Sequence, residues 1–142
     1  MNIVTLPKGY RPSEKEEFMN PVMLEFFRQK LLKWRENLLS ESSATLQNLS
    51  EEGAIQEPDI ADRASTETDR ALELRTRDRE RKLLSKIEQA LERINDGTYG
   101  YCEKTGEHIG IKRLEARPVA TLSIDAQERH ERLERTQRDE QE

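Results

Sequence analysis

The sequence predicts an all-α protein: a long antiparallel coiled-coil hairpin on a small globular head. One observation is composition, because 33% of the 142 residues are hydrophobic, 37% are charged and 5% are aromatic, too little apolar material for a large core. The other is spacing, because apolar residues recur at alternating steps of three and four in two segments, as in a coiled-coil seam. Such a seam needs only two apolar positions in seven, so the two observations agree.

Residues 1–19 are expected to form an N-terminal segment that packs on the head. Pro7, Gly9 and Pro12 interrupt it. Ser13, followed three residues later by Glu16, makes a capping-box pattern that predicts one short helix here.

Residues 20–96 are expected to form the hairpin. Its first helix should begin at Asn20 and Pro21, because asparagine is a good side-chain cap and proline suits the first helical position. Gly53 and Pro58 then interrupt the pattern, so the chain must turn between about residues 50 and 62. The expected apolar seam of this first helix is Leu24, Phe27, Leu31, Trp34 and Leu38.

The second helix should end at Asn95-Asp96-Gly97, a typical helix stop. Two long helices joined by a short turn must run antiparallel to bury both seams, and arms of nearly thirty residues reach about 40 Å. Beyond the hairpin, residues 97–126 should form the head, and residues 127–142 a charged C-terminal helix or tail. The expected seam of the second helix is Leu72, Thr76, Arg79, Leu83, Ile87, Ala90 and Ile94.

The turn and its flanks, residues 51–69, are strongly acidic. Seven carboxylates stand against one arginine there, which gives a local charge of −6. Asp59 or Asp62 could simply stabilise the start of the second helix, as a cap and through the helix dipole. A functional tip is the other interpretation. Just past it, Arg79 falls on the expected seam, where a charge suggests a partner contact or a head group that extends out of the seam.

The head contains the frame of a four-cysteine zinc site with three cysteines missing. Cys102 and Thr105 are separated by two residues, Ser123 and Ala126 by two, and the pairs by 17, which is zinc-site spacing. Alanine has no ligand atom and hydroxyls are poor ligands, so we expect hydrogen bonding and packing to replace the metal. Cys102 is then a small buried side chain. A makeshift metal site with His108 or His130, and redox sensing by Cys102, remain alternatives.

These residues carry a resemblance to a known family. The runs Tyr99–Gly110, Arg113–Pro118 and Ser123–Ala126, with Asp59–Ala64 and Glu73–Lys82, resemble the DksA family of bacterial RNA polymerase regulators. The resemblance spans roughly residues 10–126, and the missing cysteines match zinc-independent members.

The resemblance implies that the chain regulates transcription by binding RNA polymerase and not DNA. The hairpin would enter the polymerase secondary channel, with Asp59, Asp62 and Ala64 acting at the tip and Arg79 holding the arm. The effect would be a changed lifetime of promoter complexes.

The family also implies guanosine tetraphosphate as a co-regulator in the stringent response. Lys86 and Arg117 match the positions that help bind it, and charge-assisted hydrogen bonds to phosphate explain why those residue types serve. Gln127 replaces a further basic position of the family.

Several classes of function are disfavoured by the sequence. A net charge of −5 argues against a general nucleic-acid binder. The chain has no apolar stretch of about 20 residues and no signal-peptide order, and one cysteine suits a reducing compartment, so we expect a cytoplasmic monomer without a membrane partner. We expect no enzymatic activity. The rivals are a transcript-cleavage factor in which Asp59 and Asp62 hold magnesium, and a coiled-coil adaptor for another protein.

Overall fold

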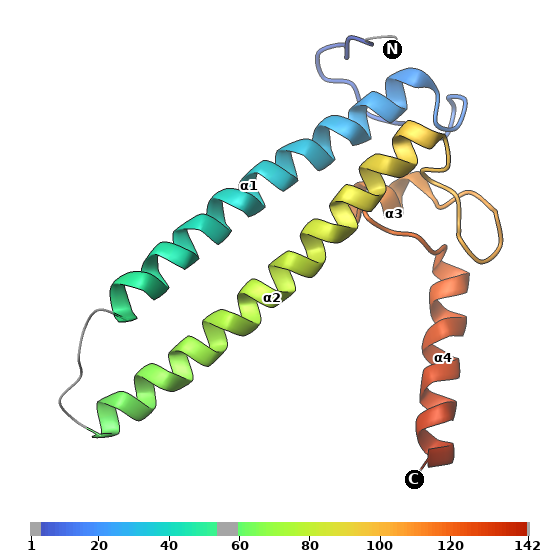
Figure 1. Cartoon of the computed structure of the whole chain (residues 1–142). Coiled ribbons are helices and arrows are strands. Elements are labelled where there is room, and N and C mark those ends of the chain that lie inside the picture. The colour runs from blue at the N-terminus through green and yellow to red at the C-terminus, as the bar shows by residue number, and fades with distance from the viewer. Residues whose placement is uncertain (1–3, 54–59, 142) are drawn as a thin grey trace. The chain divides into compact units, whose positions relative to one another are not determined.

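The computed structural model describes residues 4–53 and 60–141, and the side chains of residues 4–41 and 65–138. These residues form four helices: α1 (Pro21–Gly53), α2 (Ile60–Asp96), α3 (Ile111–Ala116) and α4 (Ile124–Gln141) (Figure 1). The described part of the chain has no strand, only one isolated antiparallel bridge between Tyr101 and His108. The all-α prediction is confirmed. None of the described helices is both long and apolar enough to cross a membrane.

The chain divides into two compact units, to which α1 and α2 both contribute. Leu32–Glu88 form the hairpin unit, and Met1–Leu31 with Gln89–Glu142 form the head unit. In the hairpin unit, α1 and α2 lie side by side and antiparallel (Figure 1). The expected α1 seam is largely confirmed, since Phe27, Leu31 and Leu38 are buried and Leu24 and Trp34 are half-buried.

The expected α2 seam is correct at Ile87 and Ala90, which are buried, but wrong over the preceding turns. Leu72 is 53% exposed, and Thr76 and Arg79 are exposed as well. The half-buried side chains there belong to a different stripe, displaced by one residue: Thr66, Arg70, Glu73, Arg77, Glu80 and Leu84. One residue is a rotation of about 100°, so both stripes satisfy the same three-four spacing.

The charged stripe can occupy the inner position because its charges alternate in sign. Arg70, Glu73, Arg77 and Glu80 follow one another at steps of three and four, so each stands beside an opposite charge. Long side chains can bury their stems and keep their heads toward water. Arg79 is therefore exposed, and the prediction that it lies on the seam is wrong.

The head unit has a continuous apolar core. The Phe27 and Tyr99 rings pack with centroids 5.5 Å apart, and the Tyr99 hydroxyl donates a hydrogen bond of 2.8 Å to the Pro118 carbonyl. Burial raises the pKa of Tyr99 above its ordinary value. Lys30 Nζ also donates to the Glu115 carbonyl at 2.7 Å, which ties α1 to α3. The buried residues include Met23, Phe27, Leu31, Ala90, Tyr99, Cys102, Ile109, Ile111, Leu114, Val119, Ala120 and Ala126.

The expected helix ends agree with the structure at Asn20 and at Asp96. The Met23 N–H donates to Asn20 Oδ1 at 3.0 Å, so asparagine caps α1. After Asp96, the N–H groups of Thr98 and Tyr99 both donate to the Arg93 carbonyl, and Gly97 has φ +83°. Helix α4 begins at Ile124, three residues before the expected boundary.

The short helix predicted at Ser13 is absent from the described N-terminal residues. Glu16 does accept the Ser13 N–H at 3.0 Å, as a capping box requires, but the segment contains only turns. The Glu16 carboxylate also accepts the Tyr10 hydroxyl at 2.9 Å. Burial, and then this contact, raise the pKa of Tyr10 to about 12. Met19 has φ +52° and ends the segment directly before the Asn20 cap of α1. The residues between Ser13 and Met19 therefore form turns and no helix.

Gly100 marks a close approach between the N-terminal segment and the head loop. Its φ is +92°, and an added Cβ would lie 2.9 Å from Met19 Cε and 3.1 Å from Phe18 Cζ. The Phe18 ring is itself stacked on His108, with centroids 3.9 Å apart. Only glycine combines this backbone conformation with this contact.

We predict that Gly100→Ala destabilises the protein by about 1 kcal/mol more than Gly97→Ala, measured by urea unfolding. This destabilisation is near the lower end of the range for overpacking, because the Met19 methyl group can move although the Phe18 ring is held in place. Gly97→Ala is the matched control, since it has a similar φ of +83° but nothing within 4 Å of an added Cβ. Equal losses for the two variants would contradict the close contact.

Candidate functional site

The acidic tip lies mostly outside the described residues. Asp59 belongs to the undescribed segment 54–59. Asp62 and Ala64 are the third and fifth residues of α2, but their side chains are outside the described set. The start of α2 at Ile60 places Asp62 in the first turn, where a carboxylate complements the helix dipole. The interpretation of this acidic segment as a helix cap and its interpretation as a functional tip therefore both remain predictions.

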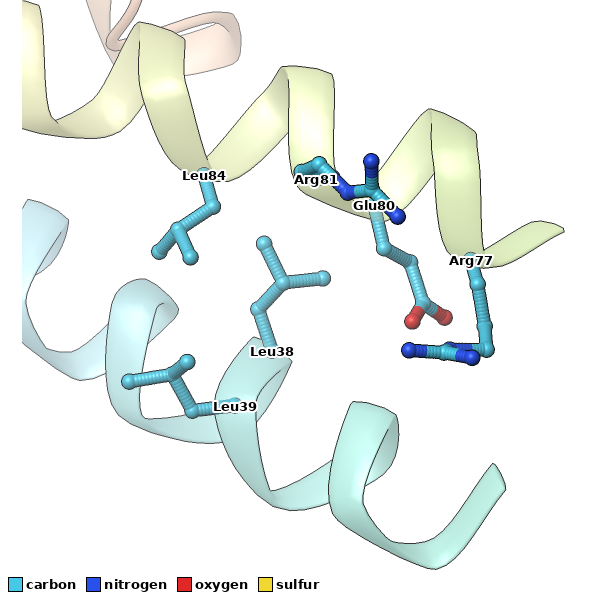
Figure 2. A pocket seen from close by; sticks show the side chains of 6 residues that line it. All are labelled: Leu38, Leu39, Arg77, Glu80, Arg81 and Leu84. Atoms are coloured by element: carbon cyan, nitrogen blue, oxygen red, sulfur yellow. The ribbon is translucent and has the colours of Figure 1, made fainter. Parts of the chain in front are cut away.

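The inner face of the hairpin unit changes from apolar to charged at Leu38 and Leu84. A cavity of about 100 Å³ lies at this boundary, lined by Leu38, Leu39, Arg77, Glu80, Arg81 and Leu84. In Figure 2 the Glu80 carboxylate and the Arg77 guanidinium point toward one another beside the leucines. Four buried polar atoms of the described residues have no hydrogen-bond partner, and all are on this charged stripe: Arg70 Nε, Glu73 Oε2, Arg77 Nε and Glu80 Oε2.

Charged groups that are partly removed from water without good hydrogen bonds stabilise a fold poorly, because desolvation offsets their attraction. The charged half of the hairpin unit is therefore held less tightly than the apolar half around Leu38 and Ile87. Alternating charges along this part of α2 can be read from the sequence, but apolar spacing placed the seam one residue away and did not predict that the charges face inward.

We predict that the double substitution Arg77→Leu/Glu80→Leu raises the free energy of unfolding by about 1–2 kcal/mol. Replacing paired charges by packed apolar residues is often stabilising, and the gain is modest here because both side chains are only half-buried. Glu80→Leu alone is the control and should be less stable than the double variant, since it leaves the half-buried Arg77 with only one of its two acidic neighbours, Glu73. Thermal unfolding followed by circular dichroism would measure both. A double variant less stable than the parent would contradict this account.

Arg79 and Lys86 are both exposed on α2, in the hairpin unit. Arg117 is exposed in the head unit, directly after α3, and its N–H donates to the Arg113 carbonyl at 2.8 Å. Lys86 and Arg117 thus belong to different units, and each is accessible within its own unit.

Cys102 lies in a compact loop of the head unit and is 3% exposed. The loop is closed by its own backbone: the Cys102 N–H donates to the Glu107 carbonyl at 2.8 Å, and the Gly106 N–H donates to the Cys102 carbonyl at 2.9 Å. A further hydrogen bond of 2.7 Å, from the Ile109 N–H to the Gly100 carbonyl, joins the two ends of the loop. The sulfur is therefore positioned by hydrogen bonds within the chain.

The Cys102 sulfur accepts several hydrogen bonds of its own. Burial alone would raise the pKa of this thiol, but the Thr105 hydroxyl and the backbone N–H groups of Ser123, Thr105 and Lys104 lower it, and the pKa is about 6. Ser123 also caps α4, since its Oγ accepts the Ala126 N–H at 3.3 Å. Thr105 and Ser123 thus supply hydrogen bonds at two positions where a zinc site has thiolates.

The residues present do not fit a tetrahedral zinc site. Within the described residues there is no group of three or more His, Cys, Asp or Glu side chains that could hold a metal ion. His108 is stacked on Phe18, and His130 pairs with Glu134 at 3.0 Å. A structural zinc site needs four ligands, and the four positions of this frame offer one thiolate.

We predict that Cys102 makes the protein more stable at high pH than at low pH. The fold lowers the pKa of the thiol from 9.0 to about 6, so its contribution is fully present above about pH 9 and is lost as the pH falls through about 6. The difference in free energy of unfolding between the parent and Cys102→Ser should therefore become smaller as the pH falls from about 9 to about 6. Urea unfolding at a series of pH values would measure it.

Thr105→Val tests the cause of the lowered pKa, because it keeps the shape of the side chain and removes the hydroxyl donor. The pKa of Cys102 should rise in this variant when followed by thiolate absorbance in the ultraviolet. A Cys102 thiol that titrates near 9 in the folded parent would overturn the hydrogen-bonded arrangement.

Comparisons with known proteins agree on one family. Residues 23–94 match the model of the DnaK suppressor protein DksA, N-terminal domain, and residues 97–132 match that of the prokaryotic dksA/traR C4-type zinc finger. The RNA polymerase-binding transcription factor DksA of Caulobacter vibrioides is 65% identical over 92% of this chain and 91% of its own. The protein of the same name from Escherichia coli K12 is 48% identical over 82% of this chain and 76% of its own.

A solved structure supports the same relationship. Transcription factor DksA2 from Pseudomonas aeruginosa is 44% identical and superposes with a TM-score of 0.77, covering 83% of this chain and 90% of that one. The similarity therefore covers both the hairpin helices and the head.

Proposed function

This chain belongs to the DksA family, and we propose that it binds RNA polymerase and thereby regulates transcription. The observation that carries the proposal is the match along nearly the whole chain to a relative named RNA polymerase-binding transcription factor DksA. The net charge of −5 supports a protein partner over DNA.

The hairpin acts inside the polymerase secondary channel. Asp59, Asp62 and Ala64 work at the acidic tip near the active site, and Arg79 holds the arm through a charged contact. The exposure of Arg79 supports this role, because a solvent-facing guanidinium on a regular helix is available to a carboxylate of a partner. The outcome is a changed lifetime of promoter complexes.

Guanosine tetraphosphate acts as the co-regulator at the interface with polymerase, as part of the stringent response. Lys86 and Arg117 contribute to its binding, and both are exposed. Arginine can bind phosphate in a bidentate manner and lysine supplies a compact charge, so the pair suits a nucleotide with several phosphates. Gln127, which is uncharged, weakens this response relative to family members with a basic residue there.

The head works without zinc. The hydrogen bonds that position the Cys102 sulfur, together with the Ser123 cap and the buried Ala126, support a loop that is held by the chain itself. The protein is then a monomeric regulator without enzymatic activity. The family match over both hairpin and head favours this interpretation over a cleavage factor or an unrelated adaptor.

We predict that Asp62→Asn binds RNA polymerase like the parent but no longer changes the lifetime of promoter complexes. Asparagine removes the charge that acts at the tip, and the loss of its interaction with the helix dipole costs only about 0.3–1 kcal/mol. Pull-down with polymerase and the decay of promoter complexes would measure the two properties separately.

Asp69→Asn is the matched control, because it removes the same charge one heptad further along α2, from an exposed position. It should keep the full effect on promoter complexes. Full activity of Asp62→Asn would refute the role of this carboxylate at the tip, and failure of the parent to bind polymerase would refute the proposed function itself.

A further inference from the structure

A cavity of about 280 Å³ lies in the head unit, between the loop around Cys102 and the first half of α4. Both segments belong to the same compact unit. Lys86 and Arg117 do not line this cavity, so it is separate from the proposed nucleotide position. The loop supplies Lys104 and Thr105 to its lining, and α4 supplies Ala126, Arg129, His130 and Leu133.

The cavity reaches two positions of the zinc-site frame, Thr105 and Ala126. In a four-cysteine site these positions carry thiolates, and a zinc ion with four thiolates has a net negative charge. Threonine and alanine bring no charge to the same positions. The basic side chains around the cavity therefore have less negative charge beside them than a frame with four cysteines would provide.

The charged lining of the cavity is basic. Lys104 comes from the loop and Arg129 from α4, and the described residues that line the cavity include no carboxylate. Asp125 stands four residues before Arg129, and Glu107 three residues after Lys104. Neither basic side chain forms an ion pair with these or any other described carboxylates, however. Two cations from different segments are thus available to one ligand.

The rest of the lining is apolar or already engaged. Ala126 is buried, whereas Leu133 is 62% exposed and offers apolar surface beside the two cations. His130 contributes its ring, because its Nε2 pairs with Glu134 at 3.0 Å. The Thr105 hydroxyl is engaged with the Cys102 sulfur. A cavity of this size is near the lower end for small-molecule sites, about 300 Å³, and therefore suits a ligand smaller than a nucleotide with several phosphates.

We propose that this cavity binds a small phosphate monoester. The phosphate lies between Lys104 and Arg129, and the carbon body of the ester packs on Leu133 and Ala126. A phosphate ester carries close to two negative charges at neutral pH and has three acceptor oxygens, so it matches two cations better than a monocarboxylate does. Arginine binds phosphate in a bidentate manner, and lysine supplies a compact charge.

The test is a titration of the full chain with phenyl phosphate at pH 8 and constant ionic strength, followed by amide chemical shifts in NMR spectra. We expect saturable shifts in the loop and the first half of α4. The dissociation constant should be on the order of 1 mM, because the lining charges are exposed. Inorganic phosphate should bind about 3- to 10-fold more weakly, since it leaves Leu133 uncovered. Leu133→Ala should remove most of that difference.

The double variant Lys104→Gln/Arg129→Gln should bind phenyl phosphate about tenfold more weakly than the parent. Lys112→Gln/Arg132→Gln is the matched control. It makes the same change in net charge at two exposed residues of the head unit that do not line the cavity. The control should bind within about twofold of the parent. Both variants should keep the helix content of the parent, because all four side chains are exposed.

Several results would overturn the proposal. A parent without saturable shifts, or equal weakening in the two double variants, would mean that the cavity is not an anion site. Equal binding of inorganic phosphate and phenyl phosphate would refute the contact with a carbon body, and benzoate that binds as tightly as phenyl phosphate would refute the assignment to a phosphate. None of these results bears on polymerase binding, so the proposed function is tested separately.

Discussion

Phe27 of α1 and Tyr99, three residues after the end of α2, pack against each other in the core of the head unit. Tyr99 also reaches the chain after α3 through its hydroxyl bond to the Pro118 carbonyl. This one buried ring therefore fixes three segments that are distant in sequence. Its place depends on the glycine stop at Gly97, which lets the chain leave α2 and turn back within two residues.

The same core explains how the head can lack three of four zinc ligands. In a structural zinc site the metal supplies folding free energy directly. Here the loop around Cys102 is closed by backbone hydrogen bonds, the start of α4 is capped by Ser123, and Phe18 stacks on His108 from outside. These contacts support the proposal that the head is held without zinc, and Ala126, which has no ligand atom, is buried at the fourth position of the frame.

The sequence was sufficient where a local interaction decides the structure. The Asn20 cap and the Gly97 stop depend on neighbouring backbone groups, so residue types at fixed offsets predicted both. The zinc-site frame was equally readable from spacing. The rotational phase of α2 could not be read from spacing, because the stripe that begins at Leu72 and the stripe that begins at Glu73 have the same spacing. The preference for apolar residues on a seam selected the wrong stripe. The short helix predicted at Ser13 is wrong for another reason: the capping contact with Glu16 forms, but the residues that follow make only turns and Met19 has a positive φ.

The error in phase is informative about the hairpin. Helix α2 leaves Leu72 and Leu74 exposed and turns a row of half-buried, alternating charges inward. Alternating charges offset one another in sign along a single helix, although four of their buried atoms have no hydrogen-bond partner. On the outer side, Asp78 stands beside Arg75 and Lys82 and pairs with Lys82 at 3.3 Å, whereas Arg79 and Lys86 have no acidic residue three or four positions away. Burial thus divides α2 into an inner stripe of alternating charges and an outer side on which Arg79 and Lys86 have no acidic neighbour on the helix, and such exposed charges are available to a binding partner.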